Sequence, residues 1–412
     1  MGDRVLELLE VIAKDLTYSL ERPWRWGSEL RDPHSLAFGS AGVALFLSYL
    51  VQALGEDRHR HSASCFLRDA ILATQHEYMQ PGFETGAIGI CWAVEHLKDS
   101  VDVESRELKL LDQWETRLYE WSQMADTPPA FADGLAGICA YAAERHPSHP
   151  SSGLFKATWG RLKDLAEITY QGATWHVSGH GKSELLKLFP GLSFSSRRYS
   201  MSVGYGVAGI VGALLASYAS GIREHGIEHL IESAVSWMMA KRCGADFHQS
   251  FPVIVGVEMP LISSGWYLGD LGVITVILNA AYLFERKDWK DAVLEIALRR
   301  AESPPTFYIH NLLYGSVGRA HFCNRLFHLT GDQRFADAAF KWYSLALGVR
   351  RPSGARGGLL NNGQPFRGLF WGTAGLGLGL LAAISSTDPA WDRFLFGSFR
   401  TAKVNSMLLQ ST

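Results

Sequence analysis

The sequence predicts an all-α fold, an α/α toroid built from seven helical-hairpin repeats with GxxG turns at its mouth. Two observations lead to this fold class. Pairs of glycines three positions apart open seven apolar runs, and amphipathic segments with apolar residues at helical spacing lie between those runs. One GxxG pair is a weak signal, but seven in quasi-regular succession indicate a helical repeat.

The glycine pairs mark the starts of the predicted inner helices. The pairs begin at Gly39, Gly86, Gly134, Gly206, Gly269, Gly315 and Gly372. Glycine at such a place serves tight turning or the close approach of another element. Because an outer helix, a turn and an inner helix alternate around a closed ring, every GxxG turn is expected at the same end. The loops at that end would line a central mouth.

The outer helices are predicted from apolar residues at three/four spacing with charges between them. They cover 60–77, 105–122, 152–169, 226–241, 289–302 and 333–347. We expect one domain over 1–412, with an N-terminal helix in 1–30, repeats from about 31 to 390 and a C-terminal tail over 391–412. No linker or low-complexity tract interrupts the repeats.

Three connections are candidates for binding loops, since long loops in compact domains are where binding residues concentrate. Two of them, 171–202 and 244–264, are expected over the mouth, and Phe251 to Val255 in the second predicts a short strand. The third, 356–367, is rich in Gly and Asn.

Composition narrows the class of protein. The net charge of −2 argues against a nucleic-acid binder, which usually shows a basic patch. The first residues lack the pattern of a signal peptide. The uncharged stretch 203–222 is long enough for a membrane span, but its glycines and serines favour a buried inner helix. Five scattered cysteines without a CxxC pair suggest neither a disulfide framework nor a zinc ribbon, and fit the cytoplasm.

From Phe38 through Gly375, the number, order and spacing of the turns resemble those of the lanthionine synthetase C-like cyclases. The resemblance implies an α/α toroid that adds a peptide cysteine thiol to dehydroalanine or dehydrobutyrine. The product would be a thioether ring in a ribosomally made peptide.

The zinc signature of that family is replaced in this chain. The family's Trp-Cys-x-Gly turn is Trp266-Tyr267-Leu268-Gly269 here, and its Cys-His-Gly is Leu313-Tyr314-Gly315. Its Ala-His-Gly, which holds an acid/base histidine, is Gly204-Tyr205-Gly206, and its acidic residue in the third repeat falls on Ala130. A catalytic zinc needs three protein ligands with N, S or carboxylate O donors. We therefore expect no metal and no cofactor, as in the family's zinc-free branch.

The candidate catalytic residues are mostly in or next to the turns. Tyr205, Tyr267 and Tyr314 stand where the zinc enzymes keep histidine and metal ligands. They protonate the enolate formed by thiol addition, bind peptide, or merely fill the vacated pocket. Asp133 and Asp270 orient a base, bind a peptide amide or cap a helix. The histidines nearest the presumed mouth, which act as bases near pH 7 or merely pack, are His34, His176, His180 and His310.

Candidate peptide contacts are aromatic or basic. Trp266 and Trp371 lie in the turns. Lys182, Arg197 and Arg198 either attract an acidic leader or a phosphorylated peptide, or form a solvated loop face.

The leading hypothesis is a zinc-independent lanthipeptide-type cyclase acting on a dehydrated ribosomal precursor peptide, with a separate kinase and lyase as partners. A kinase-like G-x-G-x-x-G-x-V match at 204–211 has no His-Arg-Asp or Asp-Phe-Gly after it, so dehydration is assigned to other proteins. The alternative is a non-catalytic scaffold that binds precursor peptide and modifying enzymes. A third possibility, a glycoside hydrolase or lyase, needs two carboxylates across the mouth, for which Asp133 and Asp270 are the candidates.

Overall fold

The computed structural model describes residues 2–18, 32–55, 57–76, 79–146, 152–179, 185, 198–244, 249–257, 265–304, 309–348, 360–361 and 364–398. These residues are mostly α-helical, with two small two-stranded sheets among them. The chain divides into two compact units. Unit 1 comprises Met1–Trp114, Ser264–Trp266 and Ala297–Trp391, and unit 2 comprises Glu115–Ser263, Tyr267–Ile296 and Asp392–Thr412.

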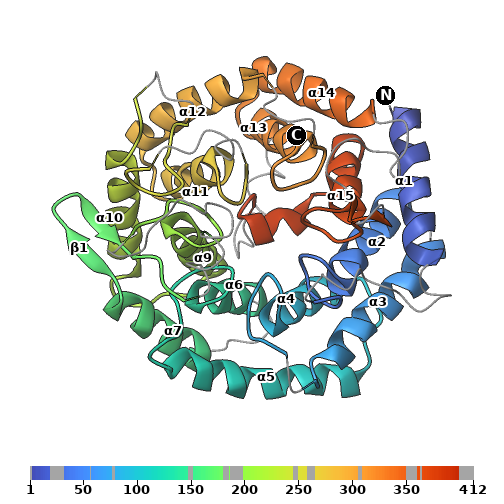
Figure 1. The fold of residues 1–412 in the computed structure, drawn as a ribbon, viewed down its shortest axis with the longest axis horizontal. Coiled ribbons are helices and arrows are strands. Elements are labelled where there is room, and N and C mark those ends of the chain that lie inside the picture. Colours follow the sequence, from blue (N-terminus) through green and yellow to red (C-terminus); the bar gives the residue numbers. More distant parts are fainter. Residues whose placement is uncertain are drawn as a thin grey trace. The chain divides into compact units, whose positions relative to one another are not determined.

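The inner helices of unit 1 pack side by side. They are α2 (Ser40–Leu54), α4 (Ala87–Leu97), α13 (Ser316–Thr330) and α15 (Thr373–Ile384). Helix α15 contacts both α2 and α13, and α2 also contacts α4 (Figure 1). They are buried along most of their length, which explains why their apolar runs show little amphipathicity in the sequence.

Outer helices cover this inner layer. Helix α3 (Arg60–Ala73) follows the short 3₁₀ helix η2 (Asp57–His59) and packs on α2, and α14 (Gln333–Leu347) packs on α13. Helix α1 (Gly2–Tyr18) packs on α15, so the N-terminal helix serves as the outer helix of the seventh repeat (Figure 1). A hairpin of β3 (Leu360–Asn361) and β4 (Gln364–Pro365) precedes the seventh turn.

Unit 2 repeats the arrangement with three inner helices, α6 (Leu135–Arg145), α9 (Val207–Ser220) and α11 (Asp270–Leu283). Helix α9 contacts both α6 and α11, while the outer helices α7 (Ser152–Asp164) and α10 (Ile227–Ala240) cover α6 and α9. Helices α5 (Ser105–Gln123) and α12 (Lys287–Glu302) and the 3₁₀ helix η3 (Ala390–Leu395) each have residues in both units.

Two sequence-based predictions give the wrong type of secondary structure. The helix predicted over 152–169 ends at Asp164, because Glu167–Thr169 forms β1, which pairs antiparallel with β2 (Gly172–Thr174). Gly172, with φ of 129°, turns the hairpin in a conformation that side chains disfavour. The strand predicted over Phe251 to Val255 is reduced to isolated bridges from Ile254, since Pro252 has no amide hydrogen to donate.

The uncharged stretch 203–222 contains a buried inner helix, as predicted, and α9 within it spans only Val207–Ser220. Among the described residues, no helix has the length and apolarity needed to cross a bilayer. Cys91, Cys139 and Cys323 are buried in inner helices, also as predicted, and burial raises the pKa of the Cys323 thiol to about 12.

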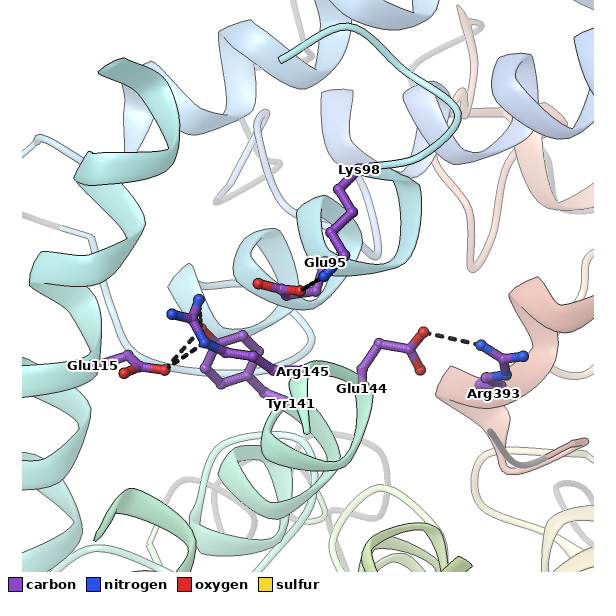
Figure 2. A network of polar contacts seen from close by, with 7 residues as sticks. All are labelled: Glu95, Lys98, Glu115, Tyr141, Glu144, Arg145 and Arg393. Atoms are coloured by element: carbon purple, nitrogen blue, oxygen red, sulfur yellow. Dashed lines mark hydrogen bonds and ion pairs between the residues drawn. The ribbon is translucent and has the colours of Figure 1, made fainter. Parts of the chain in front are cut away.

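Ion pairs hold the polar ends of the inner helices (Figure 2). In unit 2, the buried Glu144 of α6 accepts a 3.0 Å hydrogen bond from Arg393 of η3, and Arg145 lies 2.9 Å from Glu115 of α5. In unit 1, Lys98 lies 2.8 Å from Glu95 at the end of α4. The Glu144 pair fixes η3, near the C-terminus, to an inner helix.

Candidate functional site

The GxxG turns share one hydrogen-bonding pattern. In every turn that lies wholly within the described residues, the first amide of the inner helix donates to the carbonyl seven positions earlier. Examples are Leu135 N to Pro128 O and Val207 N to Ser200 O, both at 2.9 Å. The turn thereby satisfies an amide that a helix N-terminus otherwise leaves without a partner, and no side-chain cap is needed.

Close packing explains the first glycine of each pair whose surroundings the structure describes. Gly134 has φ of −156° and ψ of −157°, an extended conformation open to any residue. A Cβ atom there would overlap the carbonyl oxygen of Pro128, and the same overlap occurs at Gly86 with Gln80 and at Gly206 with Ser200. Of the two roles that the sequence allowed for these glycines, the structure supports close approach.

Backbone hydrogen bonds also join neighbouring turns within each unit. In unit 1, Phe370 N donates to Ala37 O at 2.9 Å, and Ala37 N donates to Glu84 O at 3.1 Å. In unit 2, Ala132 N donates to Gly204 O, and Val203 N donates to Tyr267 O, both at 2.9 Å. The turns therefore form one layer in each unit, and the side chains around their first glycines are brought together there.

Tyr314 and Trp371 lie together in the turn layer of unit 1. Their ring centroids are 5.3 Å apart with an interplanar angle of 56°, and both side chains are partly exposed. Gly265 gives Tyr314 room, because a Cβ at Gly265 would overlap the phenol ring. Part of the Tyr314 residue is exposed, but its phenol group is buried, and this burial, with the Glu84 carboxylate second, holds the pKa of Tyr314 well above its ordinary value. This phenol is therefore protonated at neutral pH.

His310 belongs to the same turn as Tyr314. Its Nδ1 lies 2.9 Å from the hydroxyl of Ser316, the first residue of α13. The residue is 8% exposed, and burial lowers the pKa of the imidazole below its ordinary value. The sixth turn thus combines a neutral imidazole with a protonated phenol.

Tyr205 and Tyr267 form an aromatic pair in the turn layer of unit 2. Their ring centroids are 6.1 Å apart at 80°, an edge-to-face geometry, and both residues are largely buried. The Tyr267 ring occupies the space over Gly204, where a Cβ would overlap it. These contacts support packing for Tyr267 and leave the catalytic prediction for Tyr205 untested.

The two candidate aspartates differ in their surroundings. Asp270 is fully buried, and its two carboxylate oxygens accept hydrogen bonds from the amides of Ser250 and Phe251, each at 2.8 Å. It therefore fastens the loop before the fifth turn to the N-terminus of α11, a structural contact that argues against direct chemistry. Asp133 is half-buried beside the third turn, and its function stays a prediction.

Trp266 lies in the core of unit 1 and is 1% exposed. Its indole stacks on His321 at 5.6 Å and packs edge-on against Phe322 at 6.1 Å. A side chain so enclosed does not present itself to a peptide, so the proposed substrate contact is revised to a packing role. Trp371 remains a candidate contact.

The remaining candidates lie just before a GxxG turn or in a long connection. His34 is half-buried, and its Nδ1 lies 2.9 Å from the Asp69 carboxylate of α3. Arg198 accepts a 2.8 Å hydrogen bond from Val177 N through its carbonyl, which joins the two ends of one long connection. His180, Lys182 and Arg197 fall outside the described residues.

The two long connections come together in unit 2 through a bridge between Ser200 and Ile254, while a bridge between His176 and Tyr199 joins the two ends of the first connection. Beside them His176 Nδ1 and the Tyr199 hydroxyl each lie 2.8 Å from the Glu167 carboxylate. The Tyr199 ring packs on Trp237 of the outer helix α10 at 5.8 Å. This cluster therefore lies on the outer-helix side.

Glu84, whose carboxylate acts on the Tyr314 phenol, was not among the candidate residues predicted from the sequence. It lies two positions before Gly86, yet only the aspartates directly beside a glycine pair were considered. A search for acidic residues anywhere in the pre-glycine segments would have found it.

The residues at the family's zinc-ligand positions do not fit a zinc ion. Leu313 has no donor atom, and Tyr267 and Tyr314 carry phenols engaged in ring packing. Across the part of the chain that the structure describes, no three His, Cys, Asp or Glu side chains gather in a metal-binding arrangement.

Comparison with known proteins places the chain in a family. The model of the lanthionine synthetase C-like protein family matches residues 31–396, and the chain belongs to this family. A solved structure of nisin cyclase superposes with a TM-score of 0.71 at 16% identity, covering 94% of this chain and 96% of that one. The shared fold confirms the fold class predicted from the repeats.

The other comparisons add little. A sugar epimerase from a ruminal bacterium superposes with a TM-score of 0.43 at 11% identity, over 91% of this chain and 98% of its own, a likeness too low to support an argument. A search of curated protein sequences finds no match.

Proposed function

We propose that this protein is a zinc-independent lanthipeptide-type cyclase. It would add cysteine thiols of a dehydrated ribosomal precursor peptide to dehydroalanine or dehydrobutyrine, forming thioether rings. Membership of the lanthionine synthetase C-like family supports the reaction class. The proposed zinc independence rests on the sixth turn, where Leu313 and Tyr314 replace the family's pair of zinc ligands.

The chemistry needs a base and an acid. A base takes the thiol proton, the thiolate attacks the β-carbon, and the electron pair of the double bond moves to form an enolate that is then protonated at the α-carbon. His310, neutral because burial lowers its pKa, suits the first step. Tyr314, whose pKa is well above its ordinary value, suits hydrogen-bond donation to the enolate oxygen.

The energetic demand on such a site is modest. A cysteine with a pKa near 8.5 is about 3% thiolate at pH 7, so the missing activation is worth roughly 2 kcal/mol on population alone. Holding the thiol beside its acceptor can supply about 7–11 kcal/mol. A metal-free route therefore lies within what positioning and one base provide.

The test uses the precursor peptide after dehydration by its kinase and lyase, which we propose as separate partners. Alkylatable thiols are counted by mass spectrometry with and without this protein. Faster thiol loss at unchanged peptide mass supports the cyclase. Tight peptide binding with no faster thiol loss would contradict it and favour the non-catalytic scaffold, which would instead speed the partners' dehydration.

A further inference from the structure

One side-chain contact recurs in three of the GxxG turns that the structure describes. The side-chain oxygen of the residue four positions before the first glycine accepts the amide hydrogen of the residue just before that glycine. As acceptor and donor, the pairs are Ser35 with Phe38 at 3.2 Å, Ser202 with Tyr205 at 3.3 Å, and Asn311 with Tyr314 at 2.8 Å. In each case one short polar side chain fixes the turn.

Asn311, in the sixth turn, differs from the two serines in its donor group. Each serine hydroxyl has a further partner at 2.9 Å, the carbonyl oxygen of Asp32 for Ser35 and the hydroxyl of Ser200 for Ser202. Asn311 is fully buried, and its Nδ2 atom has no hydrogen-bond partner among the residues that the structure describes. The sixth turn therefore encloses a donor group without an acceptor.

Folding alone does not explain this amide. Burying a donor without an acceptor is unfavourable, and serine makes the same turn contact in two other repeats. The amide of Asn311 cannot turn over either, because Nδ2 would then face the Tyr314 N–H, donor against donor. An asparagine at this position thus costs stability that a serine would not.

The unpartnered amide belongs to the turn with the proposed base and acid. His310 directly precedes Asn311, and Tyr314, whose backbone amide Asn311 holds, has a protonated phenol. Tyr314 and Trp371 pack on each other and are both partly exposed, so the sixth turn borders solvent at these two side chains. A carbonyl oxygen that enters this turn with the substrate would be an acceptor for Nδ2.

We infer that the side-chain amide of Asn311 donates a hydrogen bond to the carbonyl oxygen of the dehydroalanine or dehydrobutyrine residue during thiol addition. As the thiolate bonds to the β-carbon, the electron pair of the double bond shifts and negative charge develops on that oxygen. An amide donor stabilises this charge until the α-carbon is protonated, and is itself unchanged. Because Nδ2 is enclosed in the free protein, the peptide must displace part of the turn to reach it.

The inference rests on the proposed function and adds a catalytic residue to it. Asn311→Ser separates the donor from the turn contact, because serine can accept from Tyr314 N as it does from the equivalent amide in the first and fourth turns. We expect kcat for thiol loss, per folded molecule, to fall about 100-fold with little change in KM. The denaturant midpoint should stay level or rise, since the unpartnered donor is gone.

Asn324→Ser, on α13, is the matched control. It removes an amide that donates to the carbonyl oxygen of Ala382 at 3.2 Å, so the midpoint should fall while kcat stays unchanged. The two asparagines thus have opposite expected signatures.

Direct contact is followed in the unmodified protein without turnover. Asparagine is labelled with ¹⁵N and ¹³C, and the Nδ2 proton signals of Asn311 are assigned by through-bond correlation to its backbone, which needs no variant. The probe is a capped heptapeptide that contains dehydroalanine but no cysteine. At saturation the Nδ2 proton signals of Asn311 should move downfield, while those of Asn324 stay in place.

An unchanged kcat in folded Asn311→Ser would overturn the donor role, and so would Asn311 signals that the saturating peptide leaves in place. Absence of thiol loss with the unmodified protein is instead a failure of the proposed cyclase. The two failures are therefore distinguishable.

Discussion

The amide of Phe370 donates a 2.9 Å hydrogen bond to the carbonyl oxygen of Ala37, so the seventh turn of the chain meets the first. This contact brings the aromatic residues of two distant repeats into one layer. It depends on turns that approach closely, and the glycines make that approach possible. The glycines are therefore the first structural requirement of the site.

Gly134→Ala should destabilise the fold by about 1–3 kcal/mol, because the new Cβ overlaps the carbonyl oxygen of Pro128. Gly160 in α7 is the matched control, since a Cβ atom added there would have no neighbour within 4 Å and alanine favours a helix. Gly160→Ala should be neutral or stabilising by up to about 1 kcal/mol. Denaturant midpoints measure both, and equal midpoints for the two variants would contradict the packing role of the turn glycine.

Asp270→Asn should cost about 1.5–3 kcal/mol, because an amide oxygen can replace only one of the two acceptors that hold the Ser250 and Phe251 amides. Asp337→Asn on the surface of α14 should change stability by less than about 0.5 kcal/mol. Thiol loss per folded molecule of Asp270→Asn should stay near the rate of the unmodified protein. An inactive Asp270→Asn protein of full stability would show that the carboxylate takes part in the chemistry.

The fold was predictable because its signal repeats. Seven glycine pairs each fix where an inner helix starts, and all seven inner helices begin one residue after the first glycine. The β1–β2 hairpin had no such signal, because Glu167 to Thr169 continued a helical pattern until Gly172 turned the chain. The site was less predictable, since burial of Trp266 and the bonds of Asp270 depend on segments distant in sequence.

Protonation of His310 should set the acidic limb of the curve of cyclisation rate against pH. Burial lowers its pKa, so the imidazole stays an unprotonated base at pH values below the ordinary histidine range near 6.5. The rate, followed as thiol loss from pH 5 to 8 in about half-unit steps, should fall only once pH drops through that lowered pKa. His310→Gln should lose this limb, and His328→Gln, on α13, should keep it.

The lowered pKa of His310 also makes the free energy of unfolding depend on pH. Between the lowered pKa of folded His310 and about 6.5, the unfolded chain binds more protons than the folded one, so the free energy of unfolding decreases as pH falls through that window.

An acidic limb of the cyclisation rate at or above the ordinary histidine pKa would contradict the assignment of His310 as the base.

Tyr314→Phe should lower kcat for cyclisation by about 10- to 100-fold with little change in KM, because only the phenol hydroxyl is removed. Tyr282→Phe, on the partly exposed face of α11, is the matched control and should leave kcat unchanged. An unchanged kcat in Tyr314→Phe would limit this ring to packing against Trp371 or to peptide binding.

The most direct measurement is the metal dependence of cyclisation. The protein is dialysed against a chelator, its zinc content is measured, and thiol loss from dehydrated precursor is followed with and without added zinc. We expect thiol loss above the protein-free rate in the chelator-treated sample and no gain from zinc. A rate that falls to the protein-free level and returns with stoichiometric zinc would contradict the zinc-independent cyclase.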